Sequence, residues 1–248
     1  MTVERTVRVL LSSLVCSLPS ANSRDRRLSV WTILLTYHVA FLEGLKVTLA
    51  LCAITWGVGL VSGIGLGTLG AHAPVTWGRF SRGAAFVFSS IPALVILFWL
   101  HYPAQAAFEL VINPFYTAAL ALTLINTFAV GEMVREAVSD FPRQYITAGQ
   151  VCGMRGRDIV RYVQLPILFR QLLPGLMVQQ VAMLHASLFA SLISVEEIFR
   201  VAQRINSTIY RPVEIYTALA LFFLVVCLPI NLFAAYLKKR YTRDTSER

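Results

Sequence analysis

The chain has 248 residues, of which 56% are hydrophobic and only 14% are charged, and its mean hydropathy is +0.65. This composition leaves too few polar side chains to cover a soluble globular domain, so we expect the chain to lie in a lipid bilayer. The formal net charge of +9 does not indicate a nucleic-acid-binding protein, because the basic residues lie between apolar runs rather than on one folded surface.

Five apolar runs are long enough to cross the hydrocarbon core, which needs roughly 20 residues of helix. They cover residues 47–71, 83–102, 115–131, 172–195 and 213–237. Only helices and closed barrels satisfy every backbone group inside a bilayer, and the alternating pattern of a barrel is missing. The sequence therefore predicts an all-α polytopic membrane protein with five transmembrane helices.

The basic residues predict an orientation for these spans. Most Lys and Arg of the connections follow the first and third runs or stand in the C-terminal tail, whereas the opposite side carries only Arg200, Arg204 and Arg211. Because basic loops stay in the cytoplasm, the C-terminus is expected to be cytoplasmic.

Residues 1–28 do not fit this pattern, because their five arginines would lie outside. The apolar segment 9–18 is too short to span a bilayer, and it is open whether it is a signal-peptide core, an overextension of the reading frame or a surface helix. We treat residues 1–28 as an N-terminal extension and residues 29–248 as one membrane domain.

The sequence predicts neither a metal centre nor a catalytic site. Cys16, Cys52, Cys152 and Cys227 show no C-x-x-C spacing. The phosphate-binding motif G-x-x-x-x-G-K-[ST] is missing, so ATP would have to be hydrolysed by another chain. No G-x-S-x-G motif supports a hydrolase. The chain is therefore not expected to be an enzyme.

A polar, Arg-rich segment, PRQYITAGQVCGMRGRDIVRYVQLPILFR at residues 142–170, separates the third and fourth runs. It predicts two short helices, 146–153 and 156–163, with a hinge at Gly153, whose missing Cβ permits positive φ. Leu165-Pro166 is expected to end the second helix. The result is a cytoplasmic helix-turn-helix suited to gripping a partner.

Within this segment, Ala148-Gly149, Gly153 and Leu165-Pro166 resemble the E-A-A-x3-G-x9-I-x-L-P coupling loop of ATP-binding-cassette (ABC) importer permeases. Further matches follow in order along residues 44–240: Gly44, Thr48-Leu49, Pro92, Leu97-Phe98, Glu132-x-x-Arg135, Pro174, Gln179, Arg211-Pro212-x-Glu214-x-Tyr216 and Leu228-Pro229. The chain is similar to permeases of the polar amino acid uptake family, the histidine, glutamine and arginine type.

The resemblance implies an ATP-driven importer that moves a polar amino acid or close derivative across the bacterial inner membrane. Its expected partners are two ATPase subunits, which carry ATP and Mg, a second permease subunit of the same or another kind, and an extracytoplasmic solute-binding protein. The residues expected to couple to the ATPase are Thr147, Ala148, Gly149, Gly153, Arg155, Leu165 and Pro166. Thr147 stands where the family usually has Glu.

Four polar residues in or near the spans are candidates for the translocation pathway: His185, Gln179, Ser187 and Glu132. An ionisable or polar group at that depth usually faces a cavity or a partner. The alternatives are a histidine satisfied by a neighbouring helix and a structural Glu132–Arg135 pair, since residues three apart share a helix face.

Other features also leave alternatives open. The glycines at 59, 63 and 67 form a small-residue face, which could contact another helix or only lipid. Glu196, Glu197 and Arg200 could meet the binding protein or form a solvated cluster. An ATP-independent channel or secondary carrier, or a non-transporting scaffold or sensor, is the alternative function, and an ATPase partner would discriminate among them.

Overall fold

The computed structural model describes residue 33, residues 35–109 and residues 111–246, and every regular element in these ranges is helical. The expected N-terminal extension, with Cys16 and the apolar segment 9–18, lies outside the described residues. In chain order the elements are α3 (His38–His72), α4 (Trp77–Ser90), α5 (Ala93–His101), α6 (Pro103–Ala107), α7 (Pro114–Ser139), α8 (Arg143–Val151), α9 (Gly156–Ile159), the π-helical turn η1 (Val160–Gln164), α10 (Leu165–Ser187), the 3₁₀ segment η2 (Leu188–Ile193), α11 (Ile198–Ile209) and α12 (Pro212–Ser246).

The all-α membrane architecture is confirmed. Four stretches in the described ranges are long and apolar enough to cross a membrane, and a fifth crossing is reached if the bent pair α4 and α5–α6 is one span. The four stretches are His38–His72, Pro114–Ser139, Gly156–Ile193 and Pro212–Tyr241.

The second apolar run, 83–102, is not one straight helix as expected. It breaks at Ile91–Pro92, and the helices on either side meet at 96°. Proline disfavours helical backbone in the residue before it, and Ile91 is extended, with φ −99° and ψ 127°. Pro92 therefore ends α4 and begins a new helix in another direction.

The helix after the hinge does not end at Leu165-Pro166, which corrects the second half of the helix-turn-helix prediction. α9 runs through the π-helical turn η1 into α10 as one long helix. Pro166 lies in the first turn of α10, directly after η1. A wider π-helical turn relaxes the hydrogen-bond ladder where a proline lacks its N–H, so the helix continues.

The most extensive contact between described elements joins α3 to α7, and α4 folds back against both. Glycines bring α3 and α7 together: a Cβ at Gly63 would lie 2.7 Å from the Val130 side chain, and one at Gly67 would lie 2.5 Å from the Gly131 carbonyl oxygen. The small-residue face of the first run is thus an intramolecular helix contact.

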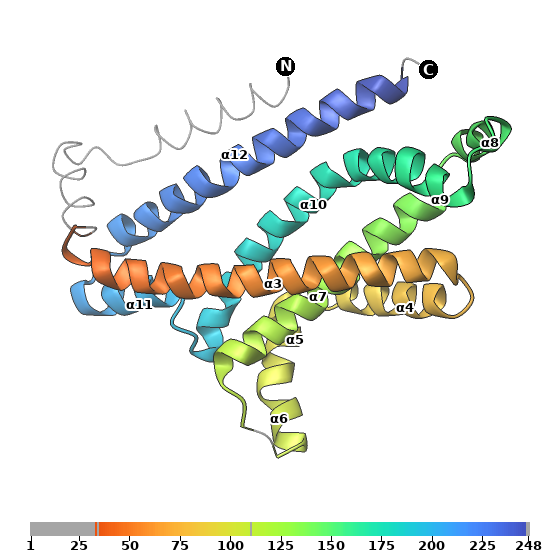
Figure 1. The fold of residues 1–248 in the computed structure, drawn as a ribbon. Helices are drawn as coiled ribbons and strands as arrows, with labels where there is room; N and C mark the ends of the chain where they lie inside the picture. The colour runs from red at the N-terminus through yellow and green to blue at the C-terminus, as the bar shows by residue number, and fades with distance from the viewer. Residues whose placement is uncertain (1–32, 34, 110, 247–248) are drawn as a thin grey trace.

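The remaining helices extend this pair. α10 packs against α7 and α12, and α11 packs against α3. Figure 1 shows α8, the α3–α4 turn and the C-terminal end of α12 at one end of the molecule, with α11 at the opposite end. The Arg-rich segment and the basic C-terminal tail therefore share one end.

Candidate functional site

The Arg-rich segment forms α8, a tight turn and α9. Gly153 in the turn has a φ of 74°, which is the left-handed conformation that the hinge prediction required. The turn closes with backbone bonds of 3.0 Å from Met154 N–H to the Gly149 carbonyl and from Gly153 N–H to the Gln150 carbonyl. This pattern terminates α8 and reverses the chain.

α8 projects from the rest of the molecule (Figure 1) and packs chiefly on α9 and η1. Gly149 makes this contact possible, because a Cβ at that position would lie 2.9 Å from the Ile159 side chain. Gly149 is accordingly buried, whereas the other expected coupling residues are exposed: Thr147, Ala148, Gly153, Arg155, Leu165 and Pro166.

Large apolar side chains are also exposed on this segment. Val151 is 83% exposed and Tyr162 is 64% exposed, among exposed arginines such as Arg143 and Arg157. Apolar groups within a basic surface, standing clear of the helix bundle, have the composition of a protein-binding patch. We call α8, the turn, α9, η1 and the first turn of α10 the α8 platform.

The four pathway candidates do not converge on one point. Ser187 is buried, and its hydroxyl donates to the Leu184 carbonyl at 2.8 Å. His185 is exposed, and its ring lies edge-on to Phe223 with centroids 6.2 Å apart.

Glu132 forms the expected ion pair with Arg135 on one face of α7. The Arg135 Nε donates to the Glu132 carboxylate at 2.8 Å. Arg135 is itself buried, so the carboxylate neutralises a guanidinium that is largely withdrawn from water. The structure thus gives Glu132 a structural partner.

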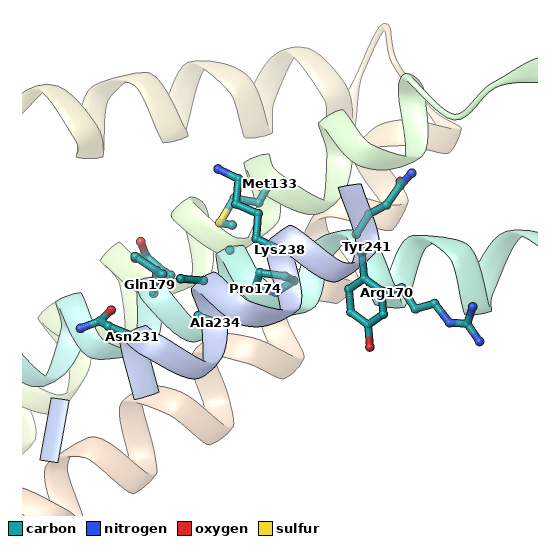
Figure 2. A pocket seen from close by; sticks show the side chains of 12 residues that line it. Met133, Arg170, Pro174, Gln179, Asn231, Ala234, Lys238 and Tyr241 are labelled. Atoms are coloured by element: carbon teal, nitrogen blue, oxygen red, sulfur yellow. The ribbon is translucent and has the colours of Figure 1, made fainter. Parts of the chain in front are cut away.

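Gln179 lines a partly open pocket of about 830 Å³ between α7, α10 and α12. Figure 2 shows Gln179 and Asn231 toward one end of this pocket and Arg170 and Tyr241 toward the other, with Pro174 between them. Arg170, Lys238 and three amides line it, and none of its described lining residues carries a carboxylate. The lining is Met133, Arg170, Gln171, Pro174, Gly175, Val178, Gln179, Asn231, Ala234, Ala235, Lys238 and Tyr241.

The sequence did not predict a hydrogen-bonded polar contact in the middle of the helix bundle. The amide of Asn126, on α7, has no exposed surface and donates to the Thr55 carbonyl at 3.0 Å and to Gln180 Oε1 at 3.1 Å. Gln180 returns a bond to Asn126 Oδ1 at 3.4 Å. This amide clasp joins α3, α7 and α10. An asparagine inside an apolar run was the available signal, since buried amides need partners.

Glu196 and Glu197, at the α11 end of the molecule, have different environments. Glu196 pairs with Arg204 at 2.9 Å on the surface. Glu197 is fully buried and accepts hydrogen bonds from the Phe199 and Arg200 backbone N–H groups, which caps α11. Burial raises the pKa of Glu197 to about 7, although these two bonds favour the charged form.

The cysteines and the possible metal ligands of the described residues are the subject of two predictions, that there is no C-x-x-C pair and no metal centre. Cys52, Cys152 and Cys227 are free thiols, with Cys152 alone of the three exposed. No cluster of His, Cys, Asp or Glu in the described ranges could hold a metal ion.

Comparisons with known proteins agree with the family resemblance of the Arg-rich segment. The family model described as "Binding-protein-dependent transport system inner membrane component" matches residues 59–243. The glutamine transport system permease protein GlnP of Escherichia coli (strain K12) is 29% identical over 216 residues, covering 85% of this chain and 96% of GlnP. The octopine transport system permease protein OccM of Rhizobium radiobacter is 28% identical over 196 residues, covering 76% of this chain and 80% of OccM.

Solved structures share the fold. An amino acid ABC transporter crystallised with histidines matches with a TM-score of 0.75 and 23% identity, covering 84% of this chain and 97% of that one. The MetNI methionine ABC transporter in an inward-facing form matches with a TM-score of 0.64 and 20% identity, over 83% and 98% of the two chains. The chain thus belongs to the family of binding-protein-dependent transport system inner membrane components, the permeases of ABC transporters.

Proposed function

We propose that this chain is the permease subunit of an ATP-driven importer that moves a polar amino acid or close derivative across the bacterial inner membrane. The observation that carries this proposal is the match to GlnP over 96% of its length. Other relatives are named for the transport of glutamate and aspartate and of octopine, which belong to the same class of solute.

The remaining parts of the machine are proposed as partners. Two ATPase subunits, which bind ATP and Mg, would supply the energy, since this chain belongs to a family of transport subunits. A second permease subunit and an extracytoplasmic solute-binding protein would complete the assembly. The C-terminus and the α8 platform would face the cytoplasm, with residues 29–248 as the membrane domain.

The α8 platform is the proposed docking site for the ATPase. Its exposed residues, Thr147, Ala148, Arg155, Leu165 and Pro166, would form the contact, and buried Gly149 would hold α8 against α9. Thr147 stands where the family usually has Glu, so the exposed arginines of this segment, Arg143, Arg155 and Arg157, would make the charged contacts with the ATPase instead.

The pathway candidates stay proposals of different weight. Gln179 is supported by its place in the pocket between α7, α10 and α12. His185 is supported by its exposure, which leaves its ring accessible to a second subunit or to solute. Ser187 and Glu132 have intramolecular partners, so a pathway role would require them to exchange those bonds.

The test compares two glycines of the α8 platform. Gly153→Val should abolish solute-stimulated ATP hydrolysis in lipid vesicles, because a β-branched residue strongly disfavours a φ of 74° and would reshape the turn. Gly156→Val is the matched control, since a Cβ at Gly156 meets nothing within 4 Å and its φ is not positive. Each variant is mixed with candidate ATPases and binding proteins over a panel of amino acids.

The outcomes separate the rival functions. Stimulation by one amino acid that Gly153→Val removes and Gly156→Val keeps would support the importer and name its solute. Solute flux without any ATPase partner would move the protein to the channel or carrier class. ATPase binding without flux would indicate a scaffold or sensor.

A further inference from the structure

Glu197 is a fully buried carboxylate that no cation neutralises in the described part of the chain. Its two oxygens accept from the backbone N–H groups of Phe199 at 2.9 Å and Arg200 at 2.8 Å. The nearby ion pair joins Glu196 to Arg204 and leaves Glu197 outside it. An ionised carboxylate in this position loses its hydration and gains in return two backbone bonds and a weaker interaction with the Thr48 hydroxyl.

This carboxylate lies where α11 meets α3. The N–H of Ile198 donates to the Thr48 hydroxyl at 3.1 Å, and that hydroxyl donates to the Gly44 carbonyl at 3.0 Å. A Cβ at Gly44 would lie 2.8 Å from the Val201 side chain and 3.1 Å from the Ile198 Cα. The first turn of α11 therefore sits directly on α3, and any separation of the two helices admits water to Glu197.

Few charged or titratable groups act on Glu197 from the surrounding elements. Its chain neighbour Glu196 raises the cost of ionising it. From α3, the Thr48 hydroxyl and the Cys52 thiol approach it. From α11, Arg200 contributes its backbone N–H, and Arg204 is paired with Glu196. The hydrophobic cluster beneath α11 includes Ile205, Ile215 and Leu219, and Tyr37 packs against it.

We propose that Glu197 is a positioning residue that holds α11 on α3 most firmly when its carboxyl group carries a proton. The protonated group keeps an acceptor oxygen for the helix N-terminus without placing a charge in the interior. Only the consequence for transport rests on the proposed function: α11 would then face the outside, and external acidity would tighten that end of the permease.

The direction of the pH effect follows from the two states of Glu197. The pKa of Glu197 is about 7 when α11 is docked and about 4.5, its ordinary value, when the side chain is hydrated. Because the docked value is higher, docking is strongest below pH 4.5, weakens as the pH rises to 7 and is constant above that. Linkage gives an opening constant about 30-fold larger at pH 8.5 than at pH 5.5.

Hydrogen exchange on the full chain in lipid nanodiscs tests this proposal without a transport assay. Peptides covering residues 195–209 are compared at pH 5.5, 7.0 and 8.5 after correction for intrinsic exchange. In the wild type the opening constant should rise about 30-fold, and Glu197→Gln should remove most of this rise. Glu196→Gln, which changes the neighbouring surface carboxylate, should keep most of the rise, because burial is the largest cause of the raised pKa of Glu197 and Glu196 is a smaller one.

Either of two results would overturn the proposal: a wild type whose corrected protection does not change with pH, or a Glu197→Gln variant that keeps the full change. If the variant does not fold, the wild-type profile still decides. Failure here would leave the importer function intact, because that function is tested by solute-stimulated ATP hydrolysis and not by α11 protection.

Discussion

Asn126 shows how a single polar residue can fix the register of three helices. Its amide group has no exposed surface and joins the Thr55 carbonyl on α3 to the Gln180 side chain on α10. An amide without a hydrogen-bond partner is costly in an apolar interior. Packings of the helices that leave the Asn126 amide without its hydrogen bonds are therefore disfavoured. The amide clasp therefore selects one arrangement of α3, α7 and α10.

Breaking the clasp should destabilise the protein. Asn126→Leu is expected to lower the free energy of unfolding by about 1–3 kcal/mol, because it removes the partner of the half-buried Gln180 amide and the buried bond to the Thr55 carbonyl. A double-mutant cycle with Gln180→Leu should give a coupling of about 0.6 kcal/mol and at most about 1.7 kcal/mol. Denaturant titration of the purified chain in mixed micelles measures both quantities.

Gln179→Leu is the control for this cycle. Gln179 is the chain neighbour of Gln180, but its side chain lines the pocket and not the clasp. Its replacement should change the unfolding free energy by less than about 0.5 kcal/mol. Equal losses at both positions would show that the membrane helices penalise any lost amide and that the clasp has no special role.

At the scale of the elements, the contact between α3 and α7 depends on glycines that allow no side chain. Gly67→Ala should destabilise the protein by about 1–3 kcal/mol through overpacking, since its Cβ would lie 2.5 Å from the Gly131 carbonyl oxygen. A backbone atom cannot move aside as a flexible side chain would. Thermal unfolding in detergent measures the change.

Gly65→Ala is the matched substitution on the other side of the same helix. A Cβ at Gly65 meets nothing within 4 Å, so alanine should be neutral or should stabilise the helix by up to about 1 kcal/mol through its better helix propensity. If Gly65→Ala and Gly67→Ala destabilise the protein equally, close packing of α3 against α7 is not the reason that Gly67 cannot be larger.

Length and hydropathy predicted the helical class and the positions of four spans, because the transfer of an apolar run to a bilayer depends on its own length and composition and not on its tertiary contacts. The break in the second run at Pro92 also carries a local signal, the restriction that proline places on Ile91. The angle at that break has no local signal. It follows from how α4 folds against α3 and α7, which brings together residues far apart in the sequence.

The α8 platform was more predictable than the interior. Gly153 determines the turn by its own φ, so its role follows from a local pattern. The continuation of α9 into α10 depends on the π-helical turn η1, and the sequence alone does not show whether Pro166 ends a helix or is accommodated by such a turn. The amide clasp and the burial of Glu197 arise only when separate helices pack, so neither partner could be identified from spacing along one helix.

At the scale of the whole molecule, the two ends differ both in the helices they carry and in their charge. One end carries α8, the α3–α4 turn and the C-terminal end of α12, and α11 lies at the other (Figure 1). Arg79 and Arg82 in α4 and the basic run at 238–240 add charge to the α8 end. Positive charge favours the cytoplasmic side, so the same basic end that is proposed to meet the ATPase is also the end expected to stay inside.

Thiol labelling tests this orientation with a cysteine that the chain already has. Cys152 on the α8 platform is exposed, whereas Cys52 and Cys227 are buried. In a Cys16→Ser background, a membrane-impermeant maleimide should leave Cys152 unmodified in spheroplasts and modify it in inside-out vesicles. Tyr210→Cys combined with Cys152→Ser is the control at the opposite end, where Tyr210 is 82% exposed, and it should react only from the outside.

Modification of Cys152 from outside would invert the orientation. Reaction of both sites from one side would mean that the two ends do not lie across a bilayer, because a spanning helix bundle must separate them.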